Sequence, residues 1–202
     1  MGDQGMTLVD YESEHITFRT SWHAAQVLWA AGEKDESNGF WSILAAAVLV
    51  HTAFEGFLND VIARACADAW QGARHTGEFR GTLGKTRFLA RHLAVPMDPA
   101  QRPYQTLAEL HARRNELVHP ETVRCKGVTT ADSYSKNPRR AVPLAFARLQ
   151  QDGFMAMCFD DLAALADTLL KAAGVKQWEA VRDLGGSAFW GPTGHGGASL
   201  KR

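Results

Sequence analysis

The sequence predicts an all-α protein, and three of its features support this class. Alanine and leucine are frequent, isolated β-branched runs are few, and such a composition favours helices. Apolar residues recur at intervals of three and four over several long stretches, the spacing that lines one face of a helix. Glycines and prolines gather between these stretches, where connections are expected. With 202 residues, 46% of them hydrophobic, the chain is one domain of ordinary size or one domain with appendages.

The chain is expected to divide into an N-terminal lead-in (1–13), a helical domain (14–175) and a glycine-rich C-terminal tail (176–202). Three widely spaced cysteines form neither a metal-binding pattern nor a disulfide framework, which suits a reducing cytoplasm. No signal peptide is evident, and the longest apolar run, Phe40–Val50, is too short to span a bilayer, so no membrane contact is expected. The sequence has no nucleotide-binding glycine loop, paired-cysteine zinc site or His-Glu-x-x-His motif, so neither a metal nor a cofactor is expected.

The first two helices are predicted from their apolar faces. The first runs from about residue 14 to 31, and the longest begins at residue 40 or 42 and ends near 70, with a polar turn at 32–39 between them. The first half of the longest helix is apolar all round, which is typical of a buried central helix. His51, on this helix, is interpreted as a core histidine rather than a ligand. The face of the first helix consists of Phe18, Trp22, Ala25 and Trp29.

Three further segments complete the predicted domain. A short helix at 83–95 has Phe88 and Leu89 toward the core and Arg87 and Arg91 toward solvent. A helix that starts after Pro103 ends near residue 119, because a following proline disfavours the α conformation. The last helix runs from about residue 154 to 173, with Gly174 as its stop. Its inward residues are Phe159, Leu162, Leu165, Ala166, Leu169 and Leu170.

The helix after Pro103 carries the most distinctive stretch of the chain, LHARRNELVHPE at 110–121. Arg114 falls on the apolar stripe of this helix, where a charge is costly unless it is paired. Asn115 and His119 are four residues apart and share a face. Arg114 and His119 are separated by about 140° around a regular helix. They therefore converge only through the long arginine side chain, an unwound last turn, or a second copy of the helix in a dimer.

These residue types suit the cleavage of RNA without a metal. Histidine exchanges protons near neutral pH, and arginine holds a phosphate through two hydrogen bonds and offsets its developing charge. Together they could help a ribose 2′-hydroxyl to attack the adjacent phosphate. The alternative is structural, with Arg114 in a buried ion pair and His119 capping the helix C-terminus.

The stretch resembles the HEPN superfamily, small all-α domains marked by an arginine, four to six residues and then a histidine, often with a polar residue directly after the arginine. Arg114, Asn115 and His119 fit this pattern, and the resemblance covers roughly residues 14–174. It implies a four- or five-helix bundle, a two-fold dimer that joins two motifs in one cleft, and a metal-independent endoribonuclease of the toxin or anti-phage kind. It assigns acid–base catalysis to His119, phosphate binding to Arg114 and an orienting role to Asn115. The products would carry 2′,3′-cyclic phosphate ends.

The arginine–histidine spacing by itself is not unique in this chain. Arg87 and His92 match it in RFLARH, and Arg113 and His119 match it more loosely. We prefer Arg114 because a polar residue follows it and because its motif ends a helix before a proline, whereas Phe88 follows Arg87.

Glu55 lies on a core-facing stripe of the longest helix, as Arg114 lies on the stripe of another helix. A carboxylate and a guanidinium at such positions are each stabilised by pairing. We expect Glu55 to pair with Arg114 and fix its guanidinium. The alternative is that Glu55 lines the dimer cleft.

The net charge of zero is unevenly spread. Residues 1–71 hold three basic and ten acidic residues, or −7, whereas residues 72–140 hold thirteen basic and six acidic, or +7. A basic middle third would suit a phosphate backbone, although it could equally pack against the acidic first third. The irregular segment 121–152 is either a basic, aromatic-containing RNA contact or a surface excursion. The candidate RNA-binding residues are Arg113, Arg87, Arg91, Lys136, Arg139 and Arg140.

The resemblance implies RNA and a second copy of the chain as partners, and an antitoxin or a nucleotidyltransferase as a further one. In some toxins of the family a tyrosine two residues after the histidine is the modified target; Glu121 occupies that position here, which puts this control in doubt. The alternative function is a non-catalytic HEPN-like module that binds nucleotides or proteins and holds a dimer together. A third is a helical scaffold in which Arg114 and His119 are structural.

Overall fold

The computed structural model describes residues 17–35, 39–68, 70, 77–119 and 146–174, and this part of the chain contains helices and no strand. The all-α prediction is confirmed for these residues. Two short 3₁₀ helices, η1 (Gly77–Phe79) and η2 (Ala147–Gln150), accompany five α-helices. The α-helices are α1 (Thr17–Lys34), α2 (Gly39–Ala65), α4 (Gly81–His92), α5 (Tyr104–Val118) and α8 (Phe154–Ala173).

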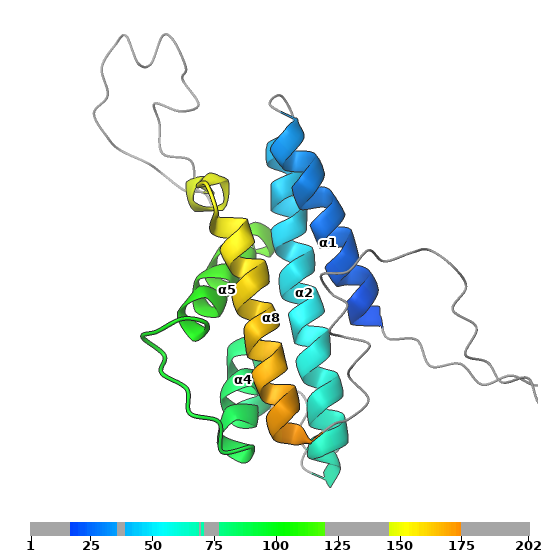
Figure 1. The fold of residues 1–202 in the computed structure, drawn as a ribbon, viewed down its shortest axis with the longest axis vertical. Coiled ribbons are helices and arrows are strands. Elements are labelled where there is room, and N and C mark those ends of the chain that lie inside the picture. The colour runs from blue at the N-terminus through cyan, green and yellow to red at the C-terminus, as the bar shows by residue number, and fades with distance from the viewer. Residues whose placement is uncertain (1–16, 36–38, 69, 71–76, 120–145, 175–202) are drawn as a thin grey trace, which may run out of the picture.

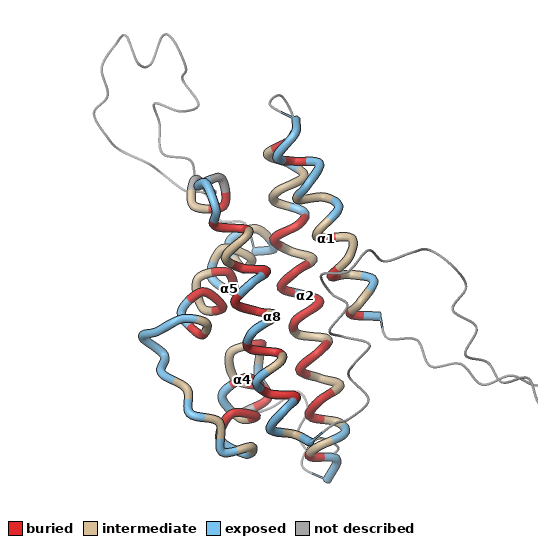
Figure 2. The backbone as a smooth tube through the Cα atoms, viewed as in Figure 1, coloured by how far each residue is buried: buried red, intermediate tan, exposed pale blue. Residues whose placement is uncertain are grey.

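Helix α2 is the centre of the bundle and packs against α1, α4, α5 and α8 (Figure 1). Helix α1 runs alongside it on one side, and α5, which also packs against α8 and α4, lies on the other. Buried positions recur along the length of α2 (Figure 2). The apolar sequence of α2 is explained by this position, because a helix covered on several sides needs apolar residues around its circumference.

By length and composition α2 could also cross a membrane. The apolar run at 40–50 is only part of this helix, which has 27 residues and whose most apolar window has a mean hydropathy of 1.5. Half of that window is buried inside the protein. The central helix of a bundle has the same properties, so the length and hydropathy of α2 are accounted for by its packing.

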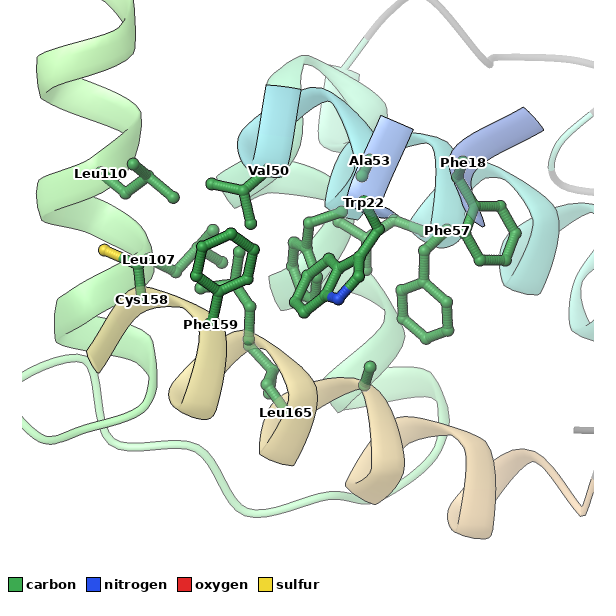
Figure 3. Packing of buried hydrophobic residues seen from close by; sticks show 14 of the residues in the cluster. Phe18, Trp22, Val50, Ala53, Phe57, Leu107, Leu110, Cys158, Phe159 and Leu165 are labelled. Carbon is green, nitrogen blue, oxygen red and sulfur yellow. The ribbon is translucent and has the colours of Figure 1, made fainter. Parts of the chain in front are cut away.

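Aromatic side chains join α1, α2 and α8 in the core (Figure 3). The ring of Phe159 meets Trp22 edge-on at 5.3 Å between centroids and stacks on Trp29 at 5.2 Å. Phe18 meets Phe57 edge-on at 5.9 Å. Such contacts combine a large buried area with favourable ring geometry, so they hold α1 against the rest of the bundle. The predicted inward faces of α1 and α8 are confirmed.

Two glycines allow α1 and α2 to approach closely where the chain reverses. A Cβ atom built on Gly39 would lie 2.0 Å from the carbonyl oxygen of Gly32, and one on Gly32 would lie 2.8 Å from the carbonyl oxygen of Gly39. Neither distance is compatible with a larger residue, so only glycine lets the two backbones meet here.

The predicted helix bounds are right to within a few residues. Helix α8 has the predicted bounds, and Gly174 follows it at φ +66°, a left-handed conformation that glycine adopts easily. Helix α4 begins at Gly81 and ends at His92, two residues earlier than predicted at its start and three at its end. Helix α2 ends at Ala65, although a backbone hydrogen bond from Trp70 to Cys66 continues the turn.

Two ion-paired contacts hold α5 against its neighbours. Asp161 on α8 accepts two hydrogen bonds from the guanidinium of Arg102, at 2.7 and 2.8 Å, and one from the hydroxyl of Thr106 at 2.5 Å. Arg148 of η2 donates to both carboxylate oxygens of Glu109, at 2.7 and 3.2 Å. Bidentate contacts of this kind fix orientation as well as distance. The first turns of α5 are therefore fixed before the motif begins.

Candidate functional site

Helix α5 carries the predicted motif at its C-terminal end. Leu107 and Leu110 are fully buried and anchor the helix, as its apolar spacing predicts. Beyond them the helix emerges from the core: Arg114 is partly buried, and Val118 is 40% exposed. Exposure thus increases toward the end of α5, where the motif lies.

A chain of three hydrogen bonds connects α2 to this motif. His51 Nε2 lies 2.9 Å from His111 Nδ1, and His111 Nε2 lies 3.0 Å from the side-chain nitrogen of Asn115. Arg114 Nη1 donates to the Asn115 side-chain oxygen at 3.1 Å. These hydrogen bonds thus connect His51, which is 1% exposed, to the partly buried guanidinium of Arg114.

Glu55 forms an ion pair with Lys85 of α4, and the expected pairing with Arg114 is not what the structure shows. The Lys85 ammonium lies 2.6 Å from Glu55 Oε1, and the two side chains are 9% and 30% exposed. A nearly buried ammonium is costly without a carboxylate partner. Lys85, on a helix that packs against α2, has the Glu55 carboxylate as this partner, whereas Arg114 donates to the side-chain oxygen of Asn115 on its own helix. The same ion pair joins the acidic first third of the chain to the basic middle third.

Six residues of α2, α4 and α5 lie together in a group that we call the polar cluster. Its members share hydrogen bonds or act on the pKa values of one another. They are His51, Glu55, Lys85, His111, Arg114 and Asn115.

The electrostatics of the polar cluster keep its histidines neutral at pH 7. Burial, followed by the charges of His111 and Arg114, lowers the pKa of His51 from 6.5 to about 4, against an opposing effect of Glu55. Burial and the charge of Arg114 also lower the pKa of His111. Burial by itself raises the pKa of Glu55, but the hydrogen bond and charge of Lys85 outweigh it and lower that pKa. With one carboxylate and two cations, the cluster carries a net charge of +1, which suits an anionic ligand.

His119 follows α5 directly and is exposed. Its backbone N–H bonds to the Asn115 carbonyl at 2.9 Å, in the last turn of the helix. Between these described side chains, no hydrogen bond or ion pair links Arg114 to His119. The two therefore present separate groups within one chain, as their angular separation on the helix predicts.

Arg114 has donors to spare. A guanidinium has five N–H donors, and within the described residues only the bond to Asn115 uses one of them. Arg114 Nε is buried without a partner there, as is Arg113 Nε. Arg113 pairs through Nη1 with Glu116 at 2.8 Å, one turn along the same helix.

The remaining predicted RNA-binding residues divide into two groups. Arg87 and Arg91 are exposed on α4, as expected for either a phosphate contact or a solvated face, and Arg87 Nε bonds to the Leu83 carbonyl at 3.2 Å. Lys136, Arg139 and Arg140 lie outside the described residues, as do most of segment 121–152 and the C-terminal tail.

Sequence reasoning missed two members of the polar cluster, His111 and Lys85. A signal for His111 was present, because His111, Asn115 and His119 follow one another at intervals of four and so share one helix face. Lys85 carried no such signal, since nothing in a local pattern distinguishes a buried lysine from a solvated one. The prediction that His51 is a core histidine agrees with its burial, but its hydrogen bond to His111 also connects it to the motif.

Among the described residues, no group of three or more His, Cys, Asp and Glu side chains is arranged to hold a metal ion. Comparison of the chain with protein-family models, curated proteins and solved structures gives no match. A function for this protein is therefore inferred from its own residues.

Proposed function

We propose that this protein is a metal-independent endoribonuclease of the HEPN type, acting in the cytoplasm on RNA as a two-fold dimer. The observation that carries the proposal is the environment of the Arg114 guanidinium. Its guanidinium is oriented by Asn115 at a partly exposed position beside two histidines held neutral, and it retains donors for a further ligand. A phosphodiester has the charge and the paired oxygens that such a group binds.

The proposed reaction divides the work between Arg114 and His119. His119 accepts the proton of a ribose 2′-hydroxyl, whose oxygen attacks the adjacent phosphorus. The bond from phosphorus to the 5′-oxygen breaks, and an imidazolium returns a proton to that oxygen. Arg114 binds the non-bridging phosphate oxygens and offsets the charge they gain in the transition state. The products are a 2′,3′-cyclic phosphate end and a 5′-hydroxyl end.

A dimer supplies the geometry that one chain lacks. Since Arg114 and His119 are not bonded within the chain, the acid–base group and the phosphate ligand meet most simply when two α5 helices face each other. Val118 is exposed in the last turn of α5, so it offers an apolar side chain next to the motif for contact between the two α5 helices.

The experiment that tests the proposal measures cleavage of a mixed RNA substrate in EDTA by the wild type, Arg114→Ala and His119→Ala. The control variants are Arg87→Ala and His92→Ala, which remove the second match to the motif from exposed positions. Arg87 is also a candidate RNA-binding residue, so its variant should lose at most one phosphate contact, which is far less than the loss of a catalytic group. Circular dichroism shows that all five proteins are folded. We expect cleavage by the wild type and both controls and a loss of at least about 100-fold in the motif variants, the usual scale of a catalytic group.

Other outcomes contradict the proposal. Equal cleavage by all five proteins excludes the motif as the active site. Loss in the Arg87 and His92 variants alone transfers the activity to the second match. If EDTA abolishes cleavage and an added divalent cation restores it, the metal-independent mechanism is excluded.

A non-catalytic HEPN-like binding module is the second candidate. The absence of a bond between Arg114 and His119 within the described chain favours it, because a binding site needs the cation and not the acid–base group. In that case no variant cleaves RNA, Arg114→Ala loses nucleotide binding, and His119→Ala retains it.

A further inference from the structure

The hydrogen-bond chain from His51 to Arg114 has a direction that its donors impose. A guanidinium has donors only, so the Asn115 side-chain oxygen must face Arg114. The side-chain nitrogen of Asn115, also a donor, then faces His111 Nε2, which must be the acceptor. The tautomer of His111 is fixed in consequence: its proton is on Nδ1 and points to His51 Nε2.

His51 completes the sequence of donors and acceptors. Because its Nε2 accepts from His111, its own proton is on Nδ1. That atom is buried and has no partner among the described residues. A buried unpaired N–H costs stability. The one hydrogen bond of the His51 ring among the described residues is the one to His111, and it favours the Nδ1–H tautomer of His111.

We propose that His111, backed by His51, is a positioning residue: as a neutral imidazole with its proton on Nδ1, it holds the Asn115 carboxamide in the orientation that binds Arg114, and a second proton breaks one of the two hydrogen bonds of that carboxamide. The inference rests on the proposed function in taking Arg114 as the phosphate ligand.

Protonation of His111 acts through this geometry. With a proton on Nε2, two donors face each other across the contact of 3.0 Å to Asn115. Rotation of the carboxamide relieves that clash but turns its NH₂ group toward Arg114, where two donors again meet. One of the two hydrogen bonds must therefore break, and in either case Asn115 no longer holds both neighbours.

The groups around His111 decide when this happens. Helix α2 contributes the neutral His51 and the Glu55 carboxylate, α4 contributes the Lys85 ammonium, and α5 contributes the Arg114 guanidinium. Burial and Arg114 lower the pKa of His111, and Glu55 acts in the opposite direction. The neutral, holding state is thus the state at neutral pH, and the hydrogen bond breaks only in acid.

The first test reads the tautomer directly and needs no activity. Long-range ¹H–¹⁵N NMR spectra of the histidine side chains are recorded on the full chain across the acidic and neutral pH range, with His111→Gln and His92→Gln to assign the signals. We expect the Nδ1–H tautomer at His111 near neutral pH, although free histidine prefers Nε2–H. An Nε2–H tautomer at His111, or a cationic His111 at neutral pH, overturns the inference.

The second test uses the pH dependence of kcat/KM for RNA cleavage. In the wild type, protonation of His111 in acid should lower kcat/KM by about tenfold, the value of one hydrogen bond, in addition to any fall that a variant without this titration shows. In His111→Gln, whose side-chain oxygen still accepts from Asn115 but does not titrate, this additional tenfold fall should be absent. His111→Leu removes the acceptor and should lose about tenfold at every pH, the value of one hydrogen bond. The exposed His92→Gln should follow the wild type.

The two proposals fail in different ways. If the wild type cleaves no RNA, the proposed function fails while the NMR tautomer still decides the positioning role. If the wild type cleaves and His119→Ala does not, but kcat/KM of His111→Gln falls in acid as far as that of the wild type, the positioning role fails and the proposed function stands. Should His111→Leu not fold, the wild-type spectra and the glutamine variant still decide the matter.

Discussion

Acidification should destabilise this protein through His51 before its carboxylates are protonated. The unfolded chain binds a proton at this histidine near pH 6.5, whereas the folded state does so only near pH 4, because burial lowers the pKa of His51 to about 4. Since the unfolded state binds the proton first, the free energy of unfolding is at its full value above pH 6.5 and falls as the pH is lowered from 6.5 to about 4.

The size of the effect follows from the difference between those two pKa values. Each pH unit is worth about 1.4 kcal/mol per proton, so a difference of about 2.5 units is worth roughly 3 kcal/mol. His51 is 1% exposed, so solvent screens this effect very little. A loss of this size is a substantial part of the stability of a typical domain, about 5–15 kcal/mol.

The assay is urea unfolding followed by circular dichroism at several pH values from about 7.5 to 4.5, on the wild type, His51→Gln and the exposed control His92→Gln. Stopping at about pH 4.5 excludes most of the carboxylate effects, because the lowered pKa values of Glu55 and Asp161 place their losses at lower pH. The wild type and the control should lose roughly 2–3 kcal/mol more than His51→Gln across this range. Parallel curves for wild type and His51→Gln would refute the reasoning, since they mean that His51 is not held neutral by burial.

Three further predictions concern the packing around the polar cluster. Glu55→Gln should lower the free energy of unfolding by about 2 kcal/mol, because it leaves the Lys85 ammonium buried without a partner. The double variant with Lys85→Met should recover most of this loss, and a double-mutant cycle in urea measures the recovery. Leu110→Ala should cost about 3 kcal/mol, whereas Val118→Ala, at an exposed position of the same helix, should cost less than about 0.5 kcal/mol. Gly81→Ala should cost about 1 kcal/mol, because Gly81 has a φ of +68° and its added Cβ meets only His111 Cε1 at 3.9 Å; full wild-type stability in thermal unfolding would contradict this.

The sequence alone determined the helices and their inward faces. Periodicity placed Phe159, Leu162 and Leu169 on the buried face of α8, and Gly174 at its end, because a face of 3.6-residue period must be covered in any fold that buries it. It also placed Arg114, Asn115 and His119 at the end of α5, since helix spacing and a following proline are local properties. The expected dimer and the proposed RNA cleavage remain predictions for the experiments above.

Only the tertiary structure decided which of these faces meet. Helix spacing shows that His51 and Glu55 share a face of α2 and that His111 and Asn115 share a face of α5, but it does not show that the two pairs lie in one polar cluster. For the same reason Glu55 was expected to pair with Arg114, whereas it pairs with the lysine of α4. Pairing of charges depends on distance across the bundle and on the cost of burying an ammonium, and neither is a property of a single helix.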